Sequence, residues 1–262
     1  MPTPRKNETK EDFINRCIPY IVENEGREPE QATAMCYSIW EESKKSVVVK
    51  ILNHSIYKSE PTLLLDDILI NGDINKKVKT SNILLTHAHQ LNVKGLNGIK
   101  EGNIYLLEKH EHFLKHHVKD VDTKFELHYI KPYEITKINT LEIFPILVKH
   151  QVQEIYGEES LGYIINRNVA IITPCYKIPK KSQEYLKNIE VLIIDGGYRI
   201  KSFYNDHKSI LETLKQFREY KNLKHIYFLG TYKDYKIKGK IKNTSIKVDT
   251  LFKGDILKIK LN

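Results

Sequence analysis

The residues best suited to chemistry are two histidines, His87 and His89, which follow the apolar run 83–85. Side chains two positions apart in an extended backbone point to the same side, so both imidazoles can reach one cation. Neutral imidazole is a favoured ligand of Zn²⁺. A His-x-His pair alone is weak evidence. One that follows an apolar strand and Thr86, and precedes a Gly-Leu pair, is a stronger indication of a metal site.

A second histidine-rich stretch covers residues 109–117. On a helix, His112 and His116 would share a face, because residues four apart are neighbours on the helix surface, and they could hold a metal ion. The same stretch also suits an amphipathic helix in which Phe113 and Leu114 face inward. We favour the amphipathic helix.

The N-terminal part of the chain predicts two helices. Thr9 and Asp12 form a capping pattern, after which apolar residues recur every four positions. Pro19 falls inside this pattern and predicts a kink or an early end of the first helix. Pro29 suits the first turn of the second helix. We expect a small helical hairpin over residues 1–46.

Cys17 and Cys36 fall on the apolar stripes of these helices and could face each other. Two interpretations are open: two buried small apolar side chains, or a disulfide or metal pair. We favour the first. Three cysteines in 262 residues are too few for a disulfide scaffold and indicate a reducing, intracellular setting.

From Val47 onward the pattern changes to short β-rich runs bounded by turn residues, which later alternate with helices. This order predicts an α/β sandwich over residues 47–262, with helices covering two sheets. No stretch approaches the ~18 continuous apolar residues of a membrane span. The polar first residues also lack the apolar region of a signal peptide, so we expect no membrane partner.

The chain has 42 Lys plus Arg and 33 Asp plus Glu, a formal net charge of +9, but only six of its basic residues are Arg. Lysine makes fewer bidentate phosphate contacts than arginine, so we favour a solvated lysine surface over a nucleic-acid interface. The net charge can still attract anionic partners. Six lysines flank the proposed site in sequence and could attract phosphates: Lys94, Lys109, Lys115, Lys177, Lys180 and Lys181.

Residues 47–262 resemble the metallo-β-lactamase fold superfamily, whose hallmark is Thr-His-x-His-x-Asp-His followed by a Gly-Leu helix. The run Phe-Pro-Ile-Leu-Val-Lys-His-Gln resembles the strand that leads to the family's third metal-binding histidine, here His150. Further matching blocks lie at residues 188–195, 206–214, 225–235 and 248–261. The resemblance implies a metallo-β-lactamase-like αββα sandwich, preceded by the helical hairpin, with a metal site at the strand ends.

The chain departs from the family pattern at the second metal site. The four expected ligand positions are occupied by Leu91, by Asn92, by Pro174 or its neighbour Cys175, and by Gly230 or Thr231. Leucine cannot bind a metal, and asparagine is a poor replacement for a neutral imidazole. We therefore expect the second metal site to be lost.

His87, His89 and His150 correspond to the ligands of the family's first metal site, which implies one zinc ion as cofactor. Three histidines with an open fourth position also occur in mononuclear zinc hydrolases. The alternative is a metal-free cluster left from a decayed site. Cys175 could be a fourth, soft ligand, but we favour an inert buried thiol.

His207 is the candidate catalytic residue outside the metal site. In phosphodiesterase branches of the family, a similarly placed histidine can protonate a leaving group. Asp206 and Ser209 could orient it, as a general acid requires. The alternative, which we favour slightly, is a helix N-terminus with Asp206 as its cap and His207 exposed.

The helical segment resembles a short module at the N-termini of assorted tailed-phage proteins, through the runs 16–26 and 34–43. This resemblance implies a phage or prophage origin. It also implies a location in the host cytoplasm, or association with the virion, and a phage or host protein as partner of the hairpin.

Three hypotheses for function follow. The first is a metal-dependent hydrolase of a phosphodiester in a nucleotide or nucleic acid. The second is a catalytically inactive protein that uses the old cleft to bind a nucleotide, nucleic acid or protein. The third is a virion component. Fold does not fix substrate, because one fold supports many chemistries.

Overall fold

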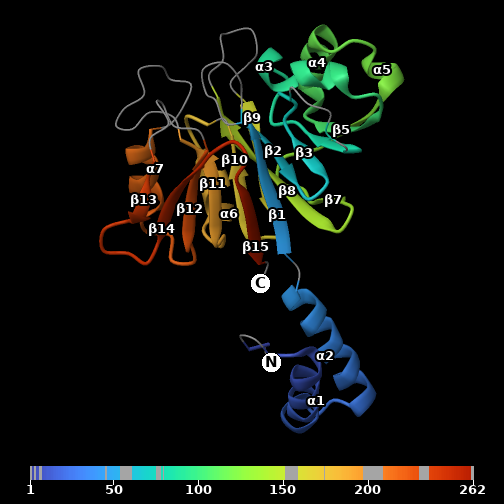
Figure 1. Ribbon diagram of the computed structural model, residues 1–262, viewed down its shortest axis with the longest axis vertical. Helices are drawn as coiled ribbons and strands as arrows, with labels where there is room; N and C mark the ends of the chain where they lie inside the picture. Colours follow the sequence, from blue (N-terminus) through green and yellow to red (C-terminus); the bar gives the residue numbers. More distant parts are fainter. Residues whose placement is uncertain are drawn as a thin grey trace. The chain divides into compact units, whose positions relative to one another are not determined.

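The computed structural model describes residues 2, 4–5, 8–44, 46–53, 61–74, 78, 80–150, 159–173, 175–196, 209–229 and 236–260, with residues 42–44 in backbone only (Figure 1). Contacts divide the chain into two compact units, Met1–Val48 with Leu257–Asn262, and Val49–Ile256. Within the described ranges, no helix combines the length and the apolar character needed to cross a bilayer.

The predicted helical pair consists of α1 (Lys10–Glu25) and α2 (Pro29–Lys44). Thr9 caps α1, because its side chain accepts a hydrogen bond from the backbone N–H of Asp12 at 3.2 Å. Gly26 follows the helix in the left-handed conformation, with φ 63°. Pro19 lies inside α1, so an early end at this residue is wrong. The helix continues because its apolar stripe, which includes the buried Ile21, packs in a core shared with α2.

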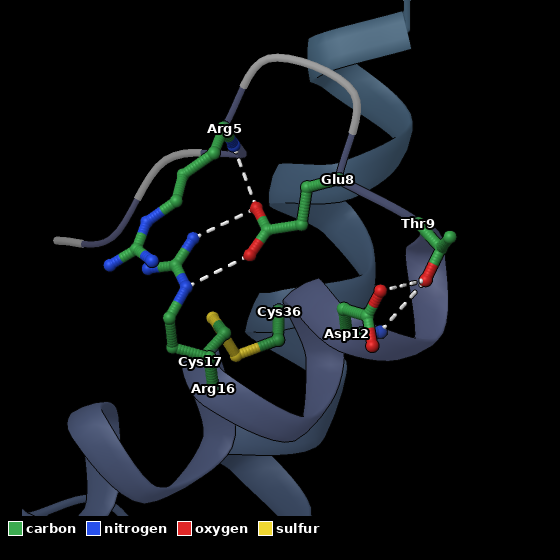
Figure 2. Close-up of polar contacts among 7 residues, drawn as sticks. All are labelled: Arg5, Glu8, Thr9, Asp12, Arg16, Cys17 and Cys36. Atoms are coloured by element: carbon green, nitrogen blue, oxygen red, sulfur yellow. Dashed lines mark hydrogen bonds and ion pairs between the residues drawn. A yellow bond between two sulfur atoms is a disulfide. The ribbon is translucent and has the colours of Figure 1, made fainter.

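A disulfide joins Cys17 of α1 to Cys36 of α2, with Cα atoms 5.9 Å apart (Figure 2). The preferred interpretation of two separate thiols is therefore wrong. A buried thiol and a half-cystine occupy the same position on an apolar stripe, so the spacing could not distinguish them. A cross-link between the stripes adds stability to a small core by restricting the unfolded chain.

Glu8 anchors the segment that precedes α1 (Figure 2). Its carboxylate accepts hydrogen bonds from Nε and Nη2 of Arg16, both at 2.9 Å, and from the backbone N–H of Arg5 at 2.7 Å. Hydrogen bonding to Arg16 and then to Arg5 lowers the pKa of Glu8. The pair is bidentate, the geometry in which Arg binds a carboxylate most strongly.

Two mixed sheets form the larger part of the fold. The first sheet has the strand order β15 (Ile256–Lys260), β1 (Ser46–Asn53), β2 (Thr62–Leu65), β3 (Ile68–Ile70), β4 (Asn82–Leu84), β5 (Gly102–Leu106), β6 (Phe125–Tyr129). The second has the order β13 (Lys238–Lys240), β14 (Lys247–Leu251), β12 (His225–Leu229), β11 (Val191–Asp195), β10 (Val169–Ile172), β9 (Glu159–Ile165), β8 (Leu141–Lys149), β7 (Thr136–Ile138).

The parallel parts of each sheet explain where the helices lie. Strands β3 to β6 are parallel neighbours, as are β10, β11, β12 and β14. Parallel neighbours need crossover connections, which place helices on a sheet face. The first sheet carries α3 (Gln90–Val93), η1 (Lys94–Gly98), η2 (Glu108–His110), α4 (Glu111–His117) and α5 (Val121–Lys124). The second carries α6 (Lys180–Leu186) and α7 (Ile210–Phe217).

Each helical layer packs in its own apolar core. One core joins Leu69, Ile83 and Ile104 of the first sheet to residues of the helices that follow β4 and β5. Another joins Ile146, Ile172 and further residues of the second sheet to α6 and α7. Alternate residues of the strands point to opposite faces, so one face of each sheet packs against the helices. The predicted αββα sandwich, preceded by a helical hairpin, is confirmed.

The imidazole of His110, at the end of η2, is almost fully buried. The neighbouring side chains of Lys109 and Glu159 form an ion pair. Burial, followed by the charge of Lys109, lowers the pKa of His110 to about 4. The imidazole is therefore neutral near pH 7.

We predict that His110 makes stability fall with acid. Its pKa is lower in the folded than in the unfolded chain, so the unfolded chain binds the proton more tightly. The stabilisation is complete above the unfolded pKa of about 6.5 and is lost as pH falls toward 4, by up to about 3 kcal/mol. Urea unfolding at about pH 7 and about pH 4.5 should show a smaller loss for His110→Gln than for the wild type. Equal losses in the two proteins would contradict this assignment.

Candidate metal centre

The backbone at the end of β4 is held by hydrogen bonds from both sheets. The carbonyl of Thr86 accepts from the backbone N–H of Leu161 at 2.9 Å and from Oγ of Ser160 at 3.2 Å, both on β9. The hydroxyl of the fully buried Tyr163, also on β9, donates to the carbonyl of Leu85 at 2.6 Å. Burial raises the pKa of Tyr163, so its phenol keeps the proton that it donates. The residues before the His-x-His pair are thus fixed by the opposite sheet.

Asn71, which follows β3, holds the same segment from within the first sheet. Its Oδ1 accepts from the backbone N–H of Thr86 at 3.1 Å and from the Thr86 hydroxyl at 2.9 Å. Its Nδ2 donates to the carbonyl of Pro61 at 3.1 Å. Asn71 has a φ of 60°, a left-handed conformation that asparagine tolerates better than most residues. It is an unanticipated positioning residue, since nothing near it in sequence indicates a contact with Thr86.

The Gly-Leu pair of the hallmark explains how the following helix approaches the strand. A Cβ on Gly95 would collide with the backbone of Gly72 and Ile74, so only glycine fits there. The backbone N–H of Gly72 also donates to the carbonyl of Asn92. This close approach fixes α3 directly behind the histidines.

The structure brings together the three histidines predicted as metal ligands. His87 and His89 follow β4, and His150 follows β8 on the other sheet. The ring centres of His87 and His89 are 6.0 Å apart, and those of His87 and His150 are 4.9 Å apart. Side chains of His87 and His150 are buried, 5% and 3% exposed. Two strands of different sheets therefore deliver imidazoles to one place.

Burial favours the neutral form of one of these imidazoles, that of His89. It lowers the pKa of His89, with a further contribution from the charge of His117. A neutral imidazole has a lone pair for a metal ion, whereas the protonated ring has none. The environment thus keeps His89 in the form that a metal ligand needs.

The spacing of the rings suits one tetrahedral ion. With metal–nitrogen bonds of ~2.0–2.1 Å, imidazoles at tetrahedral angles place their ring centres about 5 Å apart. The observed 4.9 and 6.0 Å lie close to this value. Among the described residues, however, no group of three or more His, Cys, Asp or Glu side chains is arranged to hold a metal ion. The spacing of the rings therefore suits a metal ion, but the described side chains do not form a complete site as they stand.

Asn92 contacts one of these histidines directly. It is fully buried, and its Nδ2 donates to Nδ1 of His87 at 2.7 Å. An accepting Nδ1 leaves the proton of a neutral His87 on Nε2, which removes the lone pair on that nitrogen. The Oδ1 atom of Asn92 is buried and makes no hydrogen bond to any described group. Asn92, predicted as a lost ligand, is thus a direct hydrogen-bond partner of His87.

The other positions of the predicted second metal site supply no ligand that the structure describes. Cys175 is fully buried in the apolar core beneath α6 and α7, consistent with the favoured inert thiol. Leu91 has no metal-binding atom. Pro174, Gly230 and Thr231 lie outside the described residues, as do Asp206 and His207.

The helix expected near His207 begins later than predicted. Helix α7 starts at Ile210, and Ser209 is its cap, with the Ser209 hydroxyl accepting from the backbone N–H of Glu212 at 3.2 Å. The Glu212 carboxylate accepts in return from the backbone N–H of Ser209 at 2.9 Å. The prediction of Asp206 as the cap is therefore wrong, because this reciprocal pairing satisfies the helix end. The role of His207 as proton donor stays a prediction.

Among the described residues, the histidine-rich stretch around α4 is part of no group of three or more side chains that could hold a metal ion. His112 and His116 are exposed, whereas Leu114 is buried in the helical-layer core. Phe113 packs against the same core. This is the amphipathic arrangement.

Half of the lysines expected to attract phosphates are neutralised by carboxylates. Lys94 pairs with the buried Asp73 at 3.2 Å, and Lys109 pairs with Glu159. Lys115 lies 2.7 Å from both Glu111 and Asp122. These pairs reduce the positive field that the sequence alone indicated. Charge at the rim is therefore a weak signal for an anionic substrate.

Comparisons with known proteins show which fold the chain shares. No protein-family model matches the chain, and no curated protein matches its sequence significantly. Solved structures match over most of the chain. A diphosphatase from the PhnP family is 19% identical, with a TM-score of 0.66 over 83% of this chain and 99% of that one.

Two further solved structures are also similar to the chain. The metallo-beta-lactamase fold protein YhfI from Bacillus subtilis is 11% identical, with a TM-score of 0.59 over 82% of this chain and 100% of that one. Zn²⁺-bound PqqB from Methylobacterium extorquens is 12% identical, with a TM-score of 0.57 over 80% and 99%. At these identities the likeness concerns the fold alone. The chain therefore has the fold of the metallo-β-lactamase superfamily.

Proposed function

We propose that this protein is a metal-dependent hydrolase that uses a single metal ion to cleave a phosphodiester in a nucleotide or nucleic acid. The observation that carries the proposal is the meeting of His87, His89 and His150 from two sheets. Support also comes from similar structures, one named as a diphosphatase and one bound to Zn²⁺. The substrate class rests on that likeness and on the resemblance of the sequence.

The three histidines would hold the ion, which when bound supplies Lewis-acid polarisation of a phosphoryl oxygen. The chain's own contribution is rigidity. Thr86 is fixed by Asn71 and by β9, so the two histidines that follow it lose little freedom when they bind. With Leu91 at the position of the family's Asp, a second ion has no ligand there.

Asn92 sets the condition for binding. If its amide turns by half a rotation, Oδ1 faces Nδ1 of His87 and accepts a hydrogen bond from the Nδ1–H, which leaves the lone pair on Nε2. The two ends of an amide have nearly the same shape, so this turn changes hydrogen bonds rather than volume. It gives up the bonds that Nδ2 donates to Oγ1 of Thr86 at 3.2 Å and to the carbonyl of His87 at 3.3 Å. A metal-bound histidine commonly donates its other N–H to such a partner. We infer that Asn92 is a positioning residue for His87.

A second candidate function is a non-catalytic binding protein. It is favoured by one observation, that no described group of side chains is at present arranged to hold a metal ion. The proposed partner of the helical pair, a phage or host protein, rests on sequence resemblance alone and belongs to this second candidate.

Metal content separates the two candidates. Protein purified without chelator should contain close to a single metal ion per chain and should hydrolyse bis-(p-nitrophenyl) phosphate with added Mn²⁺ or Zn²⁺. His87→Ala/His89→Ala should lose both properties, because two of three ligands are removed. His112→Ala/His116→Ala, which changes two exposed histidines, is the matched control and should behave as wild type. Less than about 0.1 ion per chain and no hydrolysis in the wild type would favour the non-catalytic candidate.

Two substitutions test the role of Asn92. Asn92→Leu removes the acceptor for the His87 proton and should weaken metal binding about 10- to 100-fold. Asn92→Asp keeps an acceptor and should bind at least as tightly as the wild type. Metal affinity is measured by competition with a chromophoric chelator, and circular dichroism checks the fold of each variant. Wild-type affinity in Asn92→Leu would show that Asn92 does not position His87.

A further inference from the structure

A cavity of about 510 Å³ opens between the second sheet and α6, away from the histidines. Its lining includes Phe144 near the start of β8, whereas His150 follows the end of that strand. Six residues of extended chain span ~20 Å. The cavity is therefore separate from the candidate metal centre. Its volume lies within the ~300–1,000 Å³ of small-molecule sites.

Aromatic rings form one wall of this cavity. Tyr185 of α6 lies 4.8 Å from Phe144 between ring centres, at an interplanar angle of 53°. Tyr133 stacks on Tyr185 at 5.5 Å, and Nζ of Lys181 lies 4.0 Å from the ring centre of Tyr133. The Tyr133 hydroxyl also contacts Oγ of Ser182 at 3.0 Å. These contacts hold the rings in place before any ligand binds.

The Tyr185 side of this wall is open to solvent. Tyr185 is 40% exposed although it is flanked by two aromatic rings. Aliphatic side chains complete the apolar surface: Ile164 is buried and Ile135 is half exposed. Aromatic rings prefer offset-stacked or edge-to-face partners. Because the two lining rings are inclined to each other, a flat ring stacked on one of them meets the other at its edge.

Polar groups stand around this apolar surface. Glu142 and Arg167 form an ion pair, with Nε to Oε1 at 2.8 Å, and Glu184 pairs with Lys187 at 2.5 Å. Asn188, which is exposed, also lines the cavity. The carboxylates offer acceptors, and the amide offers both donors and an acceptor. Since each carboxylate has a cationic partner, the cavity suits a ligand without net charge.

We infer that this cavity binds an uncharged planar nitrogen heterocycle, of the class of a purine nucleoside. The inclined rings of Phe144 and Tyr185 would contact its face and edge. Asn188 and Glu184 would hydrogen-bond its ring nitrogens and exocyclic amino group. The inference does not depend on the proposed hydrolase activity, because it uses none of the residues of the metal centre.

A fluorescence titration tests this inference on the full chain, with EDTA present throughout. 2-Aminopurine riboside should show saturable quenching, because stacking on aromatic rings quenches its emission, and adenosine should compete. Tyr185→Leu should weaken binding about tenfold because it removes a ring that stacks on the ligand. Asn188→Ala should weaken binding about tenfold because it removes a hydrogen-bond partner of the ligand. Tyr20→Leu is the matched control, since Tyr20 is 43% exposed on α1, and it should bind as wild type.

Three results would overturn the inference. One is no saturable quenching up to millimolar riboside. The second is wild-type affinity in both Tyr185→Leu and Asn188→Ala. The third is loss of binding in His87→Ala/His89→Ala with retention in Tyr185→Leu, which would place the riboside at the metal centre. Tyr185 is on the surface, and unchanged thermal unfolding of its variant would show that lost binding is not lost folding.

Discussion

The carbonyl groups of Leu85 and Thr86 are the point on which this site depends. Strand β4 ends there, and β9 of the other sheet supplies donors from its backbone, from Ser160 and from Tyr163. Buried backbone carbonyls need partners, and here the partners belong to a different sheet. The same bonds that satisfy the end of β4 therefore fix the distance between the sheets where the histidines leave them.

The imidazoles of His87 and His150 are buried and close together, and a buried polar group is costly unless it has a hydrogen-bond partner. For His87 that partner is Asn92. The family resemblance implies a histidine ligand at position 92 in a site with two ions. Under our proposal, the asparagine at this position supports His87 instead. The backbone carbonyl of the buried Asn92 also accepts a hydrogen bond from the N–H of Gly72, which holds the backbone of Asn92 beside His87.

The sequence predicted the fold well because its signals were local and repeated. Apolar strands, helix caps and the His-x-His pair each depend on neighbours in the chain. It also predicted which three histidines meet, through resemblance. It did not predict Asn71 or Tyr163, because their partners at Thr86 and Leu85 are brought close only by folding. It also missed the bond between Cys17 and Cys36, since both alternatives place cysteine on the same stripe.

The expectation that lysines near the site attract phosphates depended on charge, and the ion pairs of these lysines form only on folding. Lys94, Lys109 and Lys115 were counted as cations near the site, but each has a carboxylate beside it. Pairing of this kind cannot be counted from composition. The phage-type resemblance of residues 1–46 and the intracellular location stay predictions.

We infer that the three histidines bind one metal ion, with Asn92 supporting His87. A crystal structure of the protein grown with Zn²⁺, with anomalous differences measured at the zinc edge, would show whether they do. We expect a single peak ~2.0–2.1 Å from a nitrogen of His87, His89 and His150, with Asn92 Oδ1 facing Nδ1 of His87. A map with no peak at these residues, or with two ions there, would contradict it.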